Sequence, residues 1–336
     1  GGSVSTAALQ ATRLDLSKKS INYEELLVQL QLQGSTNLAR INVLDLSGNK
    51  LCGLPPEISL MTDLRELLCK DNWLKDIPIA MRTLGRLKVC QLKGNRLENM
   101  ACLDTPKLRE WTDAGEREED RLTVLESLQL VRAGHNRMRT LPERWNELAS
   151  LSMIVANDNE ISMLPDKLFQ STTLQGLVLS NNKLSKVPDN IAVCLNLRTL
   201  VLSYNGIREM PENFCRLRNM ERVHLDNNRL ETVPSGWMFM VKLRHVDVHN
   251  NQLSLATIRG SDFPRLAPHM ATFVIKPGNC YGTGPFKEFQ RGLSPRSMIQ
   301  IDKEEDEELA EDKTKAKGRG RAGRNRARAS KKVQEV

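Results

Sequence analysis

The chain has 336 residues, and its 49 lysines and arginines against 41 acidic residues give a formal net charge of +8 at pH 7. Hydrophobic residues make up 40% of the sequence and aromatic residues 4%, and no apolar run approaches the roughly 18 residues that a membrane-spanning helix needs. The sequence has no phosphate-binding GxxxxGK[ST] loop, no paired CxxC motif and no nucleophile-and-base signature. These features argue against a membrane-spanning protein and against an enzyme.

Residues 1–37 are expected to form an N-terminal cap. The stretch "GGSVSTAALQATRLDL" lacks the charged and apolar regions of a signal peptide. "LDLSKKSI" at 14–21 looks like a degenerate copy of a repeat that recurs later, with Lys19 where that repeat has asparagine. The spacing of "NYEELLVQLQL" then predicts a short helix.

Residues 38–254 repeat one short pattern. An asparagine followed two places on by an apolar residue occurs nine times, and seven of the eight intervals are 23 residues long, whereas Asn95 to Asn136 is 41. Around each asparagine the pattern is L-x-x-L-x-L-x-x-N-x-L, and a proline follows most copies after six residues. A fixed period of this length is the signature of a solenoid. The nine asparagines are Asn49, Asn72, Asn95, Asn136, Asn159, Asn182, Asn205, Asn228 and Asn251.

The period-two alternation before each asparagine predicts a short strand with two core-facing side chains. Stacked copies would bury these side chains against each other, which one copy alone cannot do. The asparagine is expected to hydrogen-bond backbone groups of neighbouring copies, and the proline suits an extended return segment. The predicted inward pairs are Leu44/Leu46, Leu67/Cys69, Cys90/Leu92, Val131/Ala133, Ile154/Ala156, Leu177/Leu179, Leu200/Leu202, Val223/Leu225 and Val246/Val248.

In these copies the chain resembles the leucine-rich-repeat family. The 23-residue unit with "LP" after the asparagine looks most like the intracellular, Ras-group-related class. The resemblance implies an α/β fold: a curved solenoid with a parallel β-sheet on its concave face, used mainly to bind other proteins.

Two further segments flank or interrupt the repeats. The 41-residue interval is 18 residues longer than the usual period, and these extra residues lie near 100–122, a charged stretch without the repeat's proline. Such an insertion either marks a contact or is a tolerated solvated loop. Residues 255–301 are expected to cap the C-terminal end. There "MATFVIKPGN" predicts a last strand and "GPFKEFQRGL" a short helix.

Residues between the inward pairs should face the concave surface. Val155, Val178 and Val201 are stacked there about 4.8 Å apart, and Met153 widens this apolar stripe while Tyr204 borders it. Arg132 and His135 flank the stripe on one side, and Arg222 and His224 on the other. An apolar centre with a polar rim predicts a protein-binding site. The alternative is that valine occurs here only because β-branched residues favour strands.

Histidines gather on the same face. "HVDVHN" places His245, Asp247 and His249 on one side of a strand, with His224 beside Asp247. The Cα atoms of His245 and His249 would be about 13 Å apart, too far for two ligands of one zinc, whereas a subset with His224 stays open. The sequence therefore predicts a polar or pH-sensitive part of the binding patch, with no metal and no cofactor.

The seven cysteines include Cys69 and Cys90 at core positions of the repeat, and none forms the closely spaced cluster that caps secreted leucine-rich-repeat proteins. The sequence also lacks an N-x-S/T glycosylation sequon. Both features favour a reducing, cytoplasmic setting, with a nuclear or cytoskeleton-associated location as an extension.

Residues 302–336 form a charged tail whose composition predicts disorder. Its first part, 302–312, has eight acidic residues against one lysine, and 313–336 has ten basic residues against one glutamate. The basic part could bind RNA or another polyanion such as a ribonucleoprotein or a microtubule, act as a nuclear-localisation patch, or remain an inert solvated tail. The polyanion-binding candidates are Lys315, Lys317, Arg319, Arg321, Arg324, Arg326, Arg328, Lys331 and Lys332.

Together these features predict a non-enzymatic intracellular scaffold or adaptor with a protein partner on its concave face and a basic tail attached to a polyanionic assembly. One alternative is an RNA- or ribonucleoprotein-associated factor driven by the tail. A second, implied only by the family resemblance, is a regulatory subunit in phosphatase or small-GTPase signalling.

Overall fold

The computed structural model describes residues 12–100, 103, 125–253 and 272–274, which all belong to one compact unit, 1–297. Most of the 100–122 insertion, the helix expected in "GPFKEFQRGL" and the charged tail 302–336 lie outside the described residues.

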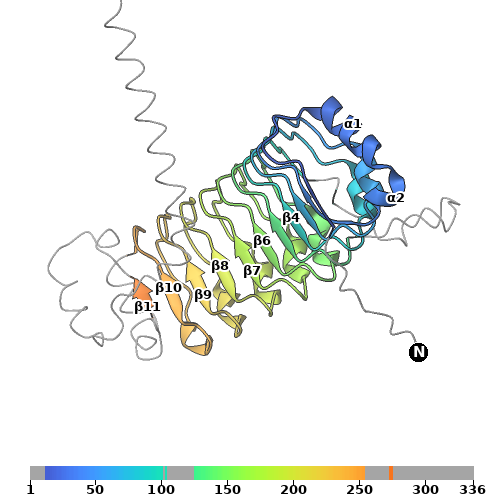
Figure 1. The fold of residues 1–336 in the computed structure, drawn as a ribbon. Helices are drawn as coiled ribbons and strands as arrows, with labels where there is room; N and C mark the ends of the chain where they lie inside the picture. Colours follow the sequence, from blue (N-terminus) through green and yellow to red (C-terminus); the bar gives the residue numbers. More distant parts are fainter. Residues whose placement is uncertain (1–11, 101–102, 104–124, 254–271, 275–336) are drawn as a thin grey trace, which may run out of the picture. The chain divides into compact units, whose positions relative to one another are not determined.

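The strands form one sheet in which every strand pairs in parallel with the next one along the chain (Figure 1). The four-residue strand β1 (Thr12–Asp15) and the five-residue strand β2 (Ile41–Asp45) are followed by strands of three residues each. These are β3 (Glu66–Leu68), β4 (Val89–Gln91), β5 (Leu130–Arg132), β6 (Met153–Val155), β7 (Gly176–Val178), β8 (Thr199–Val201), β9 (Arg222–His224), β10 (His245–Asp247) and β11 (Thr272–Val274). Strand β11 confirms the last strand predicted in "MATFVIKPGN", and β1 includes the first residues of the degenerate copy "LDLSKKSI".

Short helices form the opposite layer. Helix α1 (Tyr23–Gln33) confirms the N-terminal helix, and Asn22 caps it through a capping box with Glu25. The four-residue α2 (Ser35–Leu38) follows it. The later return segments contain the 3-10 helices η1 (Pro56–Leu60), η2 (Ile79–Thr83), η7 (Glu143–Glu147), η8 (Asp166–Gln170), η9 (Asp189–Val193), η10 (Glu212–Arg216) and η11 (Trp237–Phe239). Among the described residues, no helix has both the length and the apolar composition needed to cross a bilayer.

Six of the repeat prolines have the extended backbone that the sequence predicts and lead directly into a 3-10 helix, whereas η11 begins three residues after Pro234. Pro165 and Pro188, for example, have φ of −64° and −69° and lie immediately before η8 and η9. Because the proline ring fixes φ, this residue is prepared to begin a tight i→i+3 turn. The helical turn goes beyond the extended segment that the prolines predict.

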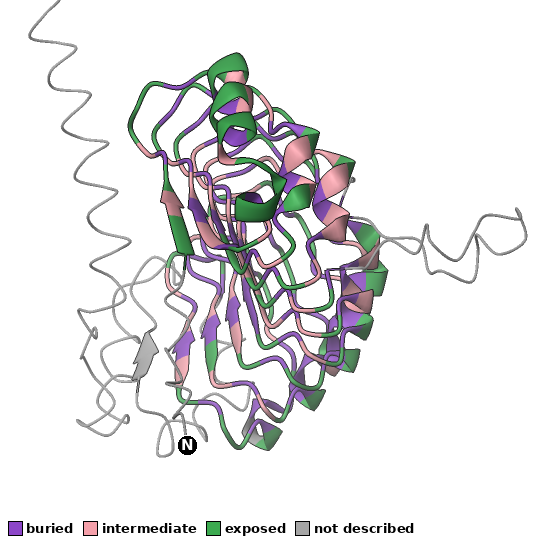
Figure 2. Ribbon diagram, turned by 45° about the vertical axis from the view of Figure 1, so that its right-hand side comes forward, coloured by how far each residue is buried: buried purple, intermediate pink, exposed green. Residues whose placement is uncertain are grey.

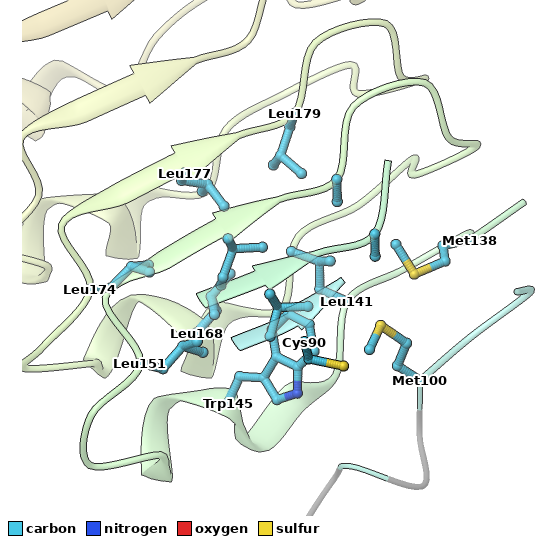
Figure 3. Close-up of a cluster of buried hydrophobic side chains, with 14 of the residues drawn as sticks. Cys90, Met100, Met138, Leu141, Trp145, Leu151, Leu168, Leu174, Leu177 and Leu179 are labelled. Carbon is cyan, nitrogen blue, oxygen red and sulfur yellow. The ribbon is translucent and has the colours of Figure 1, made fainter. Parts of the chain in front are cut away.

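Between the two layers lies a continuous apolar core. Every predicted inward pair is buried, with at most 1% of any of these side chains exposed. In Figure 2 buried positions recur along the inside of the coils, whereas the outward surfaces of both layers carry exposed and half-buried residues. Figure 3 shows Leu174, Leu177 and Leu179 of one repeat in the same buried cluster as Trp145 and Leu168 of the helical layer. The core-facing half of the pattern is therefore confirmed.

The asparagines form a ladder of hydrogen bonds between repeats, as predicted. In the eight copies from Asn72 onward, the side-chain amide donates to a carbonyl of its own repeat and to one in the repeat before, while its oxygen accepts a backbone N–H from the repeat before. Asn182, for example, donates to Leu179 O and Ala156 O at 3.0 Å each and accepts from Ile161 N–H at 3.0 Å. Asn49 does the same toward the first copy, donating to Leu16 O at 2.8 Å and accepting from Ile21 N–H.

The ladder continues across the 41-residue interval. Asn136 donates to Leu92 O at 3.0 Å and accepts from Leu97 N–H at 3.0 Å, and strand β4 pairs directly with β5 through Val89 and Leu130. The insertion therefore leaves the repeat before it and the repeat after it in contact.

The residue before each asparagine adopts a left-handed backbone conformation, which the sequence analysis did not predict. Glycine, asparagine or aspartate occupies this position in most copies, and these residues tolerate positive φ best. His135 (φ 53°) and Tyr204 (φ 56°) are the exceptions among the nine repeats. The row consists of Gly48, Asp71, Gly94, His135, Asp158, Asn181, Tyr204, Asn227 and Asn250.

Candidate partner-binding face

The sheet face is the outer surface made by the strand residues that point away from the core, and it is the surface that the family resemblance predicts to be concave. Parallel pairing places Arg132 beside Val155, Val155 beside Val178, Val178 beside Val201, Val201 beside His224 and His224 beside Asp247. All six side chains are half-buried. The structure therefore brings the predicted valines together in one row, as the 23-residue spacing indicated.

A second apolar row runs beside the valines and was only partly identified from the sequence. It consists of the first residue of each strand, so Val89, Leu130 and Met153 are adjacent in β4 to β6. A Cβ atom at Gly176 of β7 would overlap the sulfur of Met153, so the Met153 side chain extends over the glycine of the next strand. The alternation that identified the valines applies equally to Val89 and Leu130, which the sequence analysis omitted.

Tyr204 and His135 lie at the edge of the sheet face, in the left-handed row. His135 Nε2 is 3.3 Å from Asp158 Oδ2, and Asp158 also accepts hydrogen bonds from the side chains of Asn157 and Asn181. Tyr204 occupies the same position one repeat after Asn181, with 50% of its surface exposed. It lies three residues after Val201 and is an exposed aromatic residue.

Strands β9 and β10 give the sheet face a polar end. Arg222 is the register partner of His245, and His224 is that of Asp247. The rings of His224 and His245 lie 4.4 Å apart between centroids, with their planes inclined by 30°. These residues and His249 therefore converge, whereas His135 is four strands away, about 19 Å at the usual strand spacing.

Asp247 lies at the centre of this polar end. Its Oδ1 is 2.6 Å from His249 Nδ1 and accepts the His249 backbone N–H at 3.1 Å. Burial raises the pKa of the Asp247 carboxyl above its usual value, and nearby Asp226 raises it further, although the hydrogen bonds from His249 act in the opposite direction. The carboxyl is thus held in a defined orientation by its neighbour.

The opposite end of the sheet face is closed by an ion pair. Arg13 of β1 contacts Asp45 of β2 at 2.8 Å. The apolar rows therefore lie between an acidic–basic pair at one end and the histidine cluster at the other.

Comparison with known proteins agrees with this architecture. Family models described as leucine rich repeat match residues 149–207 and 195–253, and a further leucine rich repeat model matches residues 40–61. No curated protein sequence matches the chain significantly. Together with the fold, these matches identify the chain as a leucine-rich-repeat protein.

Several solved structures share the fold at low sequence identity. The LRIM1 leucine-rich repeat domain is 17% identical, with a TM-score of 0.56 over 76% of this chain and 81% of that domain. A TDR receptor is 22% identical, with a TM-score of 0.56 over 81% of this chain and 48% of the receptor. The ectodomain of the Arabidopsis thaliana receptor kinase GASSHO1/SCHENGEN3, solved in complex with CASPARIAN STRIP INTEGRITY FACTOR 2, is 22% identical, with a TM-score of 0.54 over 72% of this chain and 30% of the ectodomain.

This chain spans less than half of either receptor structure. At these identities the likeness concerns the fold alone. The particular repeat class indicated by the 23-residue period stays a prediction.

Proposed function

We propose that this protein is a non-enzymatic interaction scaffold that holds a protein partner on its sheet face, centred on Val155, Val178 and Val201. Leucine-rich-repeat folds are typical of protein–protein interaction modules. The observation that carries the proposal is a pair of adjacent apolar rows: Val155, Val178 and Val201 in β6 to β8, and Val89, Leu130 and Met153 in β4 to β6. Both rows face away from a core that is already filled on the other side of the same strands.

The surroundings of this patch support a protein as the ligand. Interfaces combine an apolar centre with a polar rim, and aromatic and arginine side chains contribute most of their binding energy. Tyr204 is half exposed near the valines, Arg132 lies next to Val155 at one end of the valine row, and Arg222 follows Thr199 in the neighbouring row. The patch therefore has anchoring groups at its margins as well as an apolar centre.

We place this scaffold in a reducing, intracellular compartment. None of the five cysteines among the described residues forms a disulfide, and four of the five, Cys69, Cys90, Cys194 and Cys215, are buried core residues. Buried thiols packed as apolar groups suit a protein that is not exposed to oxidising conditions.

The basic part of the tail supplies a second, electrostatic attachment in this proposal. Its net charge of +9 over 313–336 is the supporting observation, since clustered lysines and arginines bind polyanions by releasing counterions. If the tail provided most of the affinity, the protein would instead be an RNA- or ribonucleoprotein-associated factor. Raising the salt concentration and adding nuclease distinguish the two, because both treatments weaken tail-driven binding and leave apolar docking nearly unchanged.

The test of the sheet face is a matched pair of substitutions in one repeat. Val178→Asp places a charge in the middle of the valine row, whereas Val193→Asp places the same charge on η9, where Val193 is already 59% exposed. Partners captured by the full-length chain are identified, and their affinity for the purified wild-type and variant proteins is then measured.

We expect Val178→Asp to reduce partner affinity at least a hundredfold while Val193→Asp leaves it unchanged, with both proteins melting close to the wild-type temperature. Equal affinity for both variants would exclude the sheet face as the docking site. Unfolding of Val178→Asp would show that this side chain belongs to the core.

A further inference from the structure

The strongest unassigned feature outside the valine row is the cluster of His224, His245 and Asp247. Each offers one ligand atom, an imidazole nitrogen or a carboxylate oxygen, and these three atoms lie within 4.8 Å of one another. The grouping follows from the register, since His224 and Asp247 are paired across β9 and β10, and His245 lies two residues before Asp247 on the same side of β10.

The three ligand atoms of this cluster are much closer together than the Cα atoms of His245 and His249. Those two histidines are four residues apart along one chain, whereas His224 approaches His245 from the neighbouring strand, with their rings 4.4 Å apart. Ligands that are each about 2.0–2.2 Å from a tetrahedral ion lie about 3.3–3.6 Å from one another. Small rotations about χ1 and χ2 bring half-buried side chains from the observed separation to that range.

Two imidazoles and a carboxylate form a donor set with a defined preference. Imidazole nitrogen suits zinc, copper, nickel and iron, whereas sites for magnesium and calcium are made of oxygen ligands. Two histidines with one carboxylate are a known ligand set of zinc sites that keep a further coordination position open. All three side chains are half-buried, so an ion would be reachable from solvent and partly shielded from it.

A neighbouring group already orients the carboxylate. His249 contacts Asp247 through both its ring nitrogen Nδ1, at 2.6 Å, and its backbone N–H, at 3.1 Å, and both contacts are with Oδ1. These two contacts leave Oδ2 without a hydrogen bond from His249. Such outer contacts hold first-shell ligands in place in metal sites.

We propose that His224, His245 and Asp247 bind one divalent transition-metal ion, with Zn²⁺ the best match, at the β9–β10 end of the sheet face. His249 acts as a positioning residue for Asp247. The ion's remaining coordination position points away from the sheet, where a ligand from water or from a bound molecule can complete the site.

The test uses the full-length protein, stripped of metal with a chelator and titrated with Zn²⁺ alone by calorimetry. We expect saturable binding of one ion at this cluster, a rise in Tm of about 5 °C at a hundredfold excess over Kd, and no comparable effect of Mg²⁺. His224→Gln, His245→Gln and Asp247→Asn should each weaken Zn²⁺ binding at least tenfold.

His135→Gln is the matched control, because His135 is on the same face but four strands away. Zn²⁺ binding that persists unchanged in His224→Gln, or that is lost equally in His135→Gln, would overturn the proposal and place the ion on thiols or on the acidic block 302–312. The absence of saturable Zn²⁺ binding would overturn it as well.

A second measurement needs no variant and so stays informative if a substitution disturbs folding. Diethyl pyrocarbonate modifies accessible imidazoles, and mass spectrometry reports each site separately. We expect Zn²⁺ to slow modification of His224 and His245 and to leave that of His135 unchanged, and equal rates with and without Zn²⁺ would count against the site. Because no partner is present, failure here leaves the proposed scaffold function untouched.

Discussion

Strands β6 to β8 and strands β9 to β10 have the same backbone and different surfaces. Both groups pair in the same parallel register, bury the same two positions per strand and share the asparagine ladder. Yet the first group presents Val155, Val178 and Val201, and the second presents His224 and Asp247 at the equivalent positions. The repeat separates the positions that fold the chain from those that give it a surface, so recognition chemistry can change from one strand to the next without altering the scaffold.

The largest expected change in stability comes from a core-facing residue of β8, and its outward-facing neighbour in the same strand serves as the comparison. Leu200 is fully buried, whereas Val201 beside it faces outward. Leu200→Ala should lower the free energy of unfolding by about 2–5 kcal/mol, because it removes buried contacts and leaves a cavity. Val201→Ala should lower it by less than about 1 kcal/mol. Urea denaturation followed by circular dichroism measures both, and similar losses would show that the two positions do not divide into core and surface.

A somewhat smaller loss of stability is expected when one asparagine of the hydrogen-bond ladder is removed. Asn182→Ala removes the amide that bonds Leu179 O, Ala156 O and Ile161 N–H and leaves those groups without their partner. The free energy of unfolding should fall by about 1–3 kcal/mol. Asn190→Ala, at an exposed position of η9 in the same repeat, is the control and should change it by less than about 0.5 kcal/mol. Equal effects would mean that the ladder contributes nothing specific.

A change of opposite sign is expected at Tyr204. A bulky residue with φ of 56° stores backbone strain. Asn181, Asn227 and Asn250 occupy the same row, and asparagine tolerates a positive φ better than tyrosine does. Tyr204→Asn should therefore raise the free energy of unfolding by up to about 1 kcal/mol while weakening partner binding. Thermal melts and affinity measurements on one preparation test both halves. A variant that is less stable and binds normally would contradict the assignment of Tyr204 to the interface.

The smallest effect concerns thiol chemistry and leaves stability unchanged. Burial raises the pKa of the Cys194 thiol to about 11, so almost none of it is thiolate at pH 8. Brief iodoacetamide treatment of the native protein should alkylate exposed Cys52 and spare Cys194. In denaturant both should react. Peptide mass spectrometry measures the two sites in one sample, and rapid native labelling of Cys194 would show that this part of the core opens readily.

Much of the fold could be predicted from the sequence, because the repeat fixes burial and register together. Once Asn159 and Asn182 are aligned, Ile154 must pair with Leu177 and Val155 with Val178, as the structure shows. The 3-10 helices were missed because five-residue turns have too few residues to display a helical period. The left-handed row was not predicted at all, because a single residue per repeat with positive φ leaves no periodic signal, and bulky Tyr204 does not indicate that conformation.

The candidate site was predictable only in outline. The spacing placed His224 beside Asp247, but distances along a single strand argued against a metal, and the approach of His245 toward His224 depends on side-chain directions across two strands. Pairwise spacing along the chain cannot supply that information. Val89 and Leu130 could have been predicted, since they occupy the same strand position as Met153, Arg222 and His245, which the alternation did place on this face.

The hydrogen bonds of Asn136 across the 41-residue interval have a consequence for cooperativity. Each repeat is coupled to its neighbour by the hydrogen bonds that its asparagine makes to the neighbour's backbone. Asn136 makes the same bonds to Leu92 and Leu97 across the longer interval that the other asparagines make across 23 residues. In a chain of nearest-neighbour units, the stability of the array depends on these interfaces more than on the length of the connections. Eighteen additional residues add only a small loop-closure entropy, because that cost grows logarithmically. The repeats on both sides of the insertion should therefore melt in one transition, and the inserted segment can vary in length and sequence while the array unfolds as a single unit.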